Sequence, residues 1–145
     1  MTISHLARRF ATSLSRQPPS ANDEAWAETW LLPSEIELWR RLSNVDRRHA
    51  VLVARRFLDR RPAADRAEVA GSLLHDVGKI EAGLGTFGRV VATIVGPRTD
   101  RFQTYHDHEA IGARLAAAAG SDAVTVALIE GRGRAAEDLR MADEV

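Results

Sequence analysis

The residues best suited to chemistry in this sequence are a histidine and an aspartate placed side by side at the end of an apolar run. They are His75 and Asp76, in the stretch LLHDVGK at residues 73–79. Consecutive side chains on an α-helix point about 100° apart, because one turn takes about 3.6 residues. The two side chains can therefore reach one metal ion only where the helix unwinds. Gly78 is predicted to mark that end, since glycine adopts backbone angles that let a chain leave a helix sharply.

Three further ligand-type residues fall on the apolar face of a predicted helix. His49, His108 and Asp143 each share helical phase with apolar neighbours, so their side chains are predicted to point into the core. A buried carboxylate is costly unless it is paired or bound to a metal. The predicted metal ligands are His49, His75, Asp76 and Asp143. Such a mixed nitrogen and oxygen set predicts a divalent metal ion as cofactor, with Mn, Fe, Ni, Co, Zn and Mg as the candidates.

Simpler interpretations of the same residues stay open. A single histidine on an apolar face is usually a hydrogen-bonded core residue, and Asp143 could lie near solvent at the end of its helix. His108 is kept as a candidate ligand of a second metal or of phosphate. His106 points about 200° away from it on a helix and is assigned to the surface or the rim of a pocket. His5, in a terminal helix, is predicted at the surface.

The basic residues nearest to these ligands are candidates for contacting an anion. Lys79 is the only lysine among twenty basic residues, and it lies just beyond the ligand pair. A compact ammonium on a flexible stem differs in kind from the planar guanidinium that the chain uses elsewhere. Arg47 and Arg48 precede His49 and could orient a phosphate, with solvated surface arginines as the alternative.

The segments that must position these residues all have the pattern of helices, so the predicted fold class is all-α. Alanine, leucine, arginine and glutamate dominate, and all of them favour helix. The predicted helices cover approximately residues 4–15, 25–31, 34–42, 46–60, 65–78, 90–95, 105–119, 124–130 and 135–144. Ser34 and Glu37 are predicted to form a capping box, and Asp46 and Ser121 are predicted N-caps. Prolines and glycines mark the loops, including the glycine-rich segment 81–89.

Length and composition limit the class of protein. The chain has 145 residues, enough for one hydrophobic core, and is predicted to be a single domain with an N-terminal helical extension over 1–43 and a core over 44–145. Its formal net charge is zero. Proteins that bind nucleic acid usually carry a surplus of basic residues, so no nucleic-acid partner is expected. It has no cysteine, which excludes thiol chemistry. No apolar run approaches the roughly 20 residues that span a bilayer, which predicts no membrane partner and a cytoplasmic location.

The ligand pattern resembles that of the HD-domain metal-dependent phosphohydrolases, whose signature H…HD…D comes from separate helices of an all-α core. It stands here as His49 in DRRHAVLVA, as the pair in LLHDVGK and as Asp143 in LRMADEV. The HDVGK form and the later HEAIGARL are similar to the subgroup that includes HD-GYP domains. The GYP signature is missing, as is a further histidine near residues 126–131. The resemblance implies a bundle of five core helices, with additional helices before it, and the four predicted ligands around a first metal. It also implies that Asp76 bridges to a second metal near His108.

Residues and resemblance together predict a metal-dependent phosphatase or phosphodiesterase that acts on a nucleotide or another small phosphate ester. A bound metal lowers the pKa of its water and polarises the phosphoryl oxygen. Asp76 and Lys79 are the predicted catalytic residues, the first to orient or deprotonate water and the second to neutralise developing charge. Two alternatives stay open, a non-catalytic regulatory HD module with a metal site and a di-iron oxygenase of the same fold. Substrate identity, metal count and oligomeric state are left open.

Overall fold

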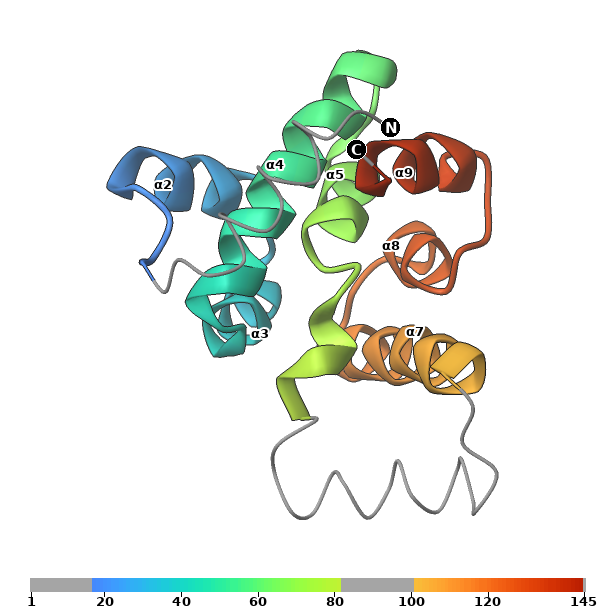
Figure 1. Cartoon of the computed structure of the whole chain (residues 1–145). Helices are drawn as coiled ribbons and strands as arrows, with labels where there is room; N and C mark the ends of the chain where they lie inside the picture. The colour runs from blue at the N-terminus through green and yellow to red at the C-terminus, as the bar shows by residue number, and fades with distance from the viewer. Residues whose placement is uncertain (1–16, 82–100, 145) are drawn as a thin grey trace, which may run out of the picture.

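A computed structural model describes residues 17–81 and 101–144, and every regular element in these ranges is a helix (Figure 1). The α-helices are α2 (Ala21–Thr29), α3 (Pro33–Arg41), α4 (Asn44–Arg60), α5 (Arg66–Leu73), α7 (Arg101–Ala118), α8 (Ala123–Ile129) and α9 (Ala136–Asp143). One 3₁₀-helix, η1, covers Val77–Glu81. The all-α prediction is confirmed for the described residues. The predicted helices at 4–15 and 90–95, the segment 82–89 and His5 lie outside them.

Helices α4 and α5 lie in the middle of the molecule, with α2 and α3 on one side and α7, α8 and α9 on the other (Figure 1). Helix α5 packs against α4 and α8, while α9 packs against α4 and α7 contacts both α8 and η1. One hydrophobic cluster joins α2 and α3 to the central helices and includes the fully buried Trp39. A second cluster, around Phe57 and Leu139, joins α4 to α8 and α9. None of the described helices is long and apolar enough to cross a bilayer.

The N-terminal helices begin at residues other than those predicted. Helix α2 starts at Ala21, because the Ser20 hydroxyl accepts a hydrogen bond from the Asp23 N–H at 3.1 Å. The predicted capping box of Ser34 and Glu37 is wrong. Helix α3 starts at Pro33, whose fixed backbone angle suits the first position of a helix.

The carboxylate three residues into α3 replaces the predicted cap. Glu35 accepts a hydrogen bond from the Leu32 N–H at 2.8 Å. Ser34 instead donates to the Ala119 carbonyl at the end of α7. A hydroxyl that was expected to cap its own helix therefore joins two helices that are distant in sequence.

Two other predicted N-caps, Asp46 and Ser121, are also wrong, whereas a third helix starts as predicted. Helix α4 is capped by Ser43, whose hydroxyl accepts from the Asp46 N–H at 3.1 Å. Helix α8 follows Asp122 as its N-cap residue. Helix α5 follows Asp65 with a complete capping box.

Candidate metal centre

The His75–Asp76 pair lies in a turn between two helices. Helix α5 ends at Leu73, and η1 begins at Val77. The pair thus lies outside regular α-helix, as its spacing required. The prediction that Gly78 ends the helix is wrong, because α5 ends five residues earlier and Gly78 does not adopt a positive φ.

Gly78 has a different role, which is to let two backbones approach closely. A Cβ atom at this position would lie 2.0 Å from the His108 carbonyl oxygen and 3.0 Å from the Gly112 nitrogen. No side chain fits there, so η1 can pack directly on α7 only because residue 78 is glycine. This contact fixes the turn that carries His75 and Asp76 against the helix that carries His108.

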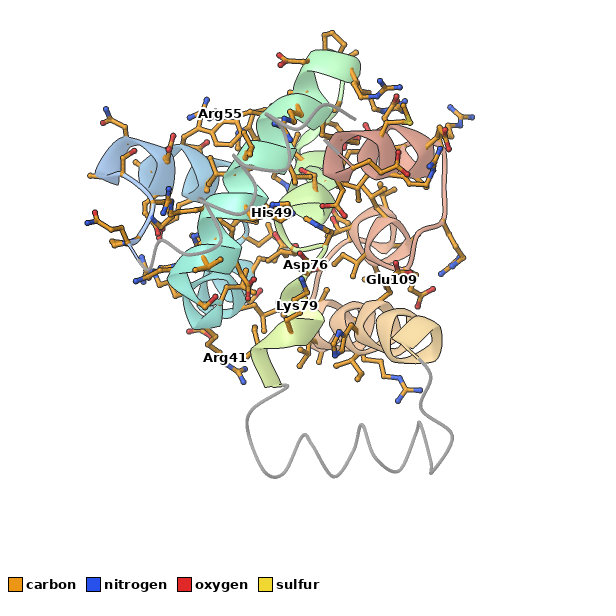
Figure 2. The ribbon with its side chains drawn as sticks, viewed as in Figure 1. Arg41, His49, Arg55, Asp76, Lys79 and Glu109 are labelled. Carbon is orange, nitrogen blue, oxygen red and sulfur yellow. The ribbon has the colours of Figure 1, made fainter. Side chains whose placement is uncertain are left out.

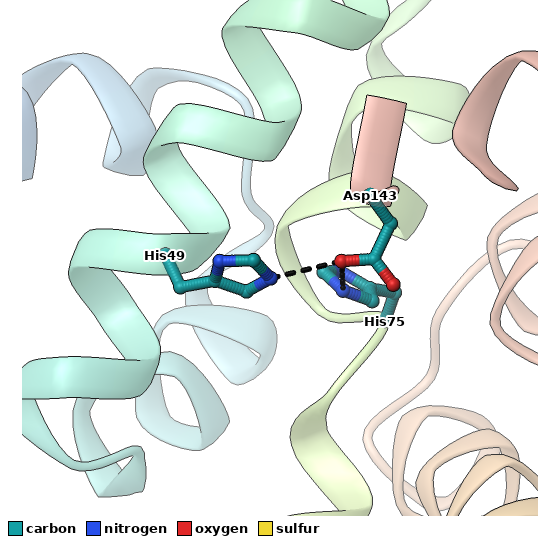
Figure 3. Close-up of side chains that lie close together, drawn as sticks. All are labelled: His49, His75 and Asp143. Atoms are coloured by element: carbon teal, nitrogen blue, oxygen red, sulfur yellow. Dashed lines mark hydrogen bonds and ion pairs between the residues drawn. The ribbon is translucent and has the colours of Figure 1, made fainter. Parts of the chain in front are cut away.

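Three of the four predicted ligands meet at one point (Figure 3). His49 comes from α4, His75 from the turn after α5 and Asp143 from the last turn of α9. One ligand atom from each lies within 4.8 Å of the others. The His49 Nε2 atom is 2.8 Å from Asp143 Oδ1, and the His75 Nε2 atom is 3.5 Å from the same oxygen. Residues separated by up to 94 positions in the chain therefore form one cluster.

The orientation of the His75 ring fits a metal ligand. Its Nδ1 donates to the Ser72 carbonyl at 2.7 Å, and its Nε2 is buried without a hydrogen-bond partner among the described residues. The side chain is 9% exposed. A histidine that donates through one nitrogen to a carbonyl presents the lone pair of the other nitrogen to a metal. The two histidines and the carboxylate are a donor set that zinc, iron, nickel or cobalt can take.

The pKa values of His75 and Asp143 are shifted because the charged side chains of the cluster lie so close together. Burial lowers the pKa of His75, but the charges of Asp76 and Asp143 outweigh it and raise the pKa to about 9. Burial acts in the opposite sense on Asp143, yet its hydrogen bond to His49 and the positive charge of the nearby His75 ring hold the pKa of that carboxyl well below its usual range. The ionised carboxyl of Asp143 and the protonated ring of His75 thus stabilise each other, and a cation bound here would take the place of the His75 proton.

Asp76 lies beside the three-residue cluster. Its Oδ2 atom is 3.4 Å from His75 Nε2 and 3.3 Å from the Lys79 ammonium. Burial lowers the pKa of Lys79, but the negative charges of Asp76, Asp46 and Asp143 outweigh burial and raise the pKa above its ordinary value. The side chain therefore stays cationic. Figure 2 shows Asp76 and Lys79 close to each other near the middle of the molecule. The predicted catalytic pair is therefore an ion pair that borders the cluster.

A cavity of about 360 Å³ opens next to the cluster. The cavity is lined by His108 from α7 and by four residues in or beside the cluster, His75, Asp76, Lys79 and Asp143. Its apolar lining residues are Leu128, Ile129, Ala136 and Leu139. His108 is not part of the three-residue cluster in the described structure. Its predicted role at a second metal or a phosphate stays a prediction, and the side chain of His106 lies outside the described residues.

The two arginines before His49 lie away from this cavity. Arg47 pairs with Glu24 at 3.2 Å, and Arg48 lines a separate pocket formed by α4, by Asp23 of α2 and by the segment just before α2. Neither is among the described residues that line the cavity. Their predicted role in binding phosphate stays a prediction.

Four charged residues of the cavity were not predicted as site residues: Glu109, Glu130, Glu137 and Arg140. Arg140 lies three positions before Asp143 on α9. Residues three apart lie on the same side of a helix. Helical phase could therefore have identified Arg140 once Asp143 was taken as a ligand. Glu130 lies at the end of α8, where no periodicity indicated a site.

The chain was compared with protein-family models, with curated proteins and with solved structures. No family model, no curated protein and no solved structure matched the chain.

Proposed function

We propose that the protein is a metal-dependent phosphohydrolase that acts on a small phosphate ester. The observation that carries the proposal is His75, a residue that lines the cavity and whose Nε2 atom is buried without a hydrogen-bond partner among the described residues. His49 and Asp143 complete the set that would hold the metal. A metal site that opens on a cavity favours catalysis over a purely structural role, because structural sites are usually closed.

Each residue around the cluster has a separate task in this proposal. A divalent ion, when bound, would lower the pKa of its water and polarise a phosphoryl oxygen. Ser72 fixes the ring of His75 through its carbonyl. Asp76 is placed to accept a proton from water, and Lys79 keeps that carboxylate oriented at 3.3 Å while supplying positive charge at the cavity.

Metal analysis combined with a substrate screen tests the proposal. Purified protein should bind a divalent metal, and the loaded protein should hydrolyse p-nitrophenyl phosphate or bis(p-nitrophenyl) phosphate in the presence of Mn, Ni, Co or Mg. His75→Ala should lose both the metal and the activity, because it removes a ligand from the cluster. His108→Ala is the matched control, since it removes a cavity histidine outside the cluster and should keep the metal.

Two results would contradict the proposal at different levels. Wild-type metal content in His75→Ala would show that the cluster is not the metal site. A metal-loaded wild-type protein that hydrolyses neither ester would agree with the metal site but contradict the phosphohydrolase activity.

A further inference from the structure

The cavity is rich in carboxylates and poor in cationic side chains. Its acidic lining residues in the described structure are Asp76, Glu109, Glu130, Glu137 and Asp143. Among the described lining residues, Lys79 and Arg140 are the only lysine and arginine. Lys79 is paired with Asp76 at 3.3 Å. A phosphate that enters this acidic cavity is repelled by its carboxylates, so the availability of Arg140 matters to its binding.

Arg140 lies close to Asp143 along the chain and lines the same cavity as two residues of the cluster, His75 and Asp143. It is one turn before Asp143 on α9, and residues three apart are neighbours on a helix surface. Its side chain is 55% exposed, so a ligand can reach it from the cavity. The guanidinium carries a fixed fork of donors that matches the oxygens of a phosphate.

The guanidinium of Arg140 already binds anionic oxygens, which are those of two glutamates. Glu137 contacts it with both oxygens, at 2.6 Å from Nη2 and 3.2 Å from Nε. Glu144 accepts from Nη1 at 2.6 Å. Both glutamates are more than half exposed. Exposed ion pairs contribute little to stability, so a dianion can exchange for one of them at small cost.

We propose that Arg140 is the phosphate-binding arginine of the cavity, and that a phosphate group binds by displacing Glu137 from its guanidinium. The inference rests on the proposed function and assigns the residue that recognises its class of substrate, a phosphate monoester with a dianionic phosphoryl group. It replaces Arg47 and Arg48, which do not line the cavity in the described structure. Glu137 then acts as a competitor that keeps weaker anions out.

Binding of inorganic phosphate to the metal-loaded full chain, measured by calorimetry, tests this exchange. Arg140→Gln should weaken binding by about tenfold or more, because a hydrogen-bonded charge is lost. Glu137→Gln should tighten binding, because the competitor for the guanidinium is removed. The double variant should bind as weakly as Arg140→Gln, since the gain from Glu137→Gln requires the arginine.

A second surface ion pair in the same region supplies matched controls. Arg132 pairs with Glu130 as Arg140 pairs with Glu137, but Arg132 is not among the described lining residues. Arg132→Gln should leave phosphate binding unchanged. Glu130→Gln removes one negative charge from the cavity lining without freeing Arg140, so it should tighten binding less than Glu137→Gln does.

The outcomes separate this inference from the proposed function. Wild-type phosphate affinity in Arg140→Gln, with hydrolysis retained, overturns the role of Arg140 and leaves the phosphohydrolase standing. If Glu130→Gln and Glu137→Gln raise the phosphate affinity equally, the displacement of Glu137 by phosphate is overturned. The gain in affinity then comes only from the loss of negative charge. A metal-loaded wild-type protein that neither binds phosphate nor hydrolyses the two esters overturns both proposals.

Discussion

At the scale of single residues, His75 is the side chain whose surroundings are most unusual. Its Nε2 atom lies 3.4 Å from Asp76 Oδ2 and 3.5 Å from Asp143 Oδ1. A proton on this nitrogen places a positive charge within 3.5 Å of both carboxylates. That attraction exceeds the effect of burial and explains why the pKa of His75 rises to about 9.

The raised pKa predicts how the stability of the metal-free protein depends on pH. The folded state binds the His75 proton more tightly than the unfolded chain, whose histidine has a pKa of about 6.5. The contribution to the free energy of unfolding is therefore fully present below pH about 6.5 and is lost as the pH rises through about 9. Urea unfolding of EDTA-treated protein should show a loss on the order of 2–3 kcal/mol across this range. His75→Gln should show a much flatter profile, and an equally steep one would contradict the assignment.

Three of the four residues predicted to share a metal, His49, His75 and Asp143, lie together in the structure, and helical phase explains part of this result. Helical phase places a side chain on the buried side of its own helix, and this is enough to turn His49 and Asp143 inward. Phase does not show which buried residues meet. Asp76 was predicted as a ligand beside His75, but its carboxylate is 3.3 Å from the Lys79 ammonium and outside the three-residue cluster.

At the scale of elements, the contact between η1 and α7 holds the ligand turn in place. Gly78 and Gly112 form this contact, and each lacks a side chain where the other backbone passes. Because a backbone carbonyl cannot move aside as a flexible side chain can, the crossing tolerates no added methyl group. The glycine in HDVGK is thus explained by packing between two elements and not by the end of a helix.

Gly78→Ala should destabilise the protein strongly and disturb the metal site. The added Cβ would lie 2.0 Å from the His108 carbonyl oxygen, so η1 or α7 must shift. We expect a loss of about 3 kcal/mol or more in the free energy of unfolding, measured by urea titration, together with weaker metal binding.

Gly120→Ala is the control for Gly78→Ala. Gly120 has a φ of 83° and nothing within 4 Å of its would-be Cβ, so this change costs only the strain of a left-handed alanine, about 1 kcal/mol. Similar losses in the two variants would contradict a packing role for Gly78.

The helix starts show where element prediction from sequence fails. Ser34 and Ser121 are both reasonable caps by residue type. In the folded chain their hydroxyls donate to the Ala119 carbonyl and to the Glu35 carboxylate, partners 85 and 86 residues away. Local preference is weak, about 1 kcal/mol for a cap, so a partner from a distant segment decides. Asp65, with Glu68 three residues later, was predictable because its partners are local.

At the scale of the whole molecule, a buried carboxylate ties the N-terminal helices to the rest. Glu35 on α3 is fully buried. Its oxygens accept hydrogen bonds from Arg66 at the start of α5, at 3.2 Å, and from Ser121 before α8, at 2.6 Å. Removing one partner of such a buried pair is strongly destabilising, because the other partner is left uncompensated. We infer that α2 and α3 unfold together with the helices that carry the metal cluster.

The positions of the tryptophans allow this cooperativity to be measured. All three, Trp26, Trp30 and Trp39, lie in α2, α3 and the turn between them, whereas the cluster lies on α4, α9 and the turn after α5. Tryptophan fluorescence therefore reports the N-terminal helices, and far-ultraviolet circular dichroism reports every helix. We expect the two unfolding transitions in urea to coincide, and Glu35→Gln to shift both to lower urea by the same amount.

Metal binding should shift both transitions to higher urea, although no tryptophan is part of the cluster. A ligand that binds only the folded state at a hundred times its dissociation constant adds about 2.7 kcal/mol to the free energy of unfolding. If the chain unfolds as one unit, that increment appears equally in fluorescence and in circular dichroism, and EDTA reverses it. A fluorescence transition that comes first and ignores the metal would show that α2 and α3 form a separate unit. It would also place the stabilising effect of the cluster on α4, α5 and α9 alone.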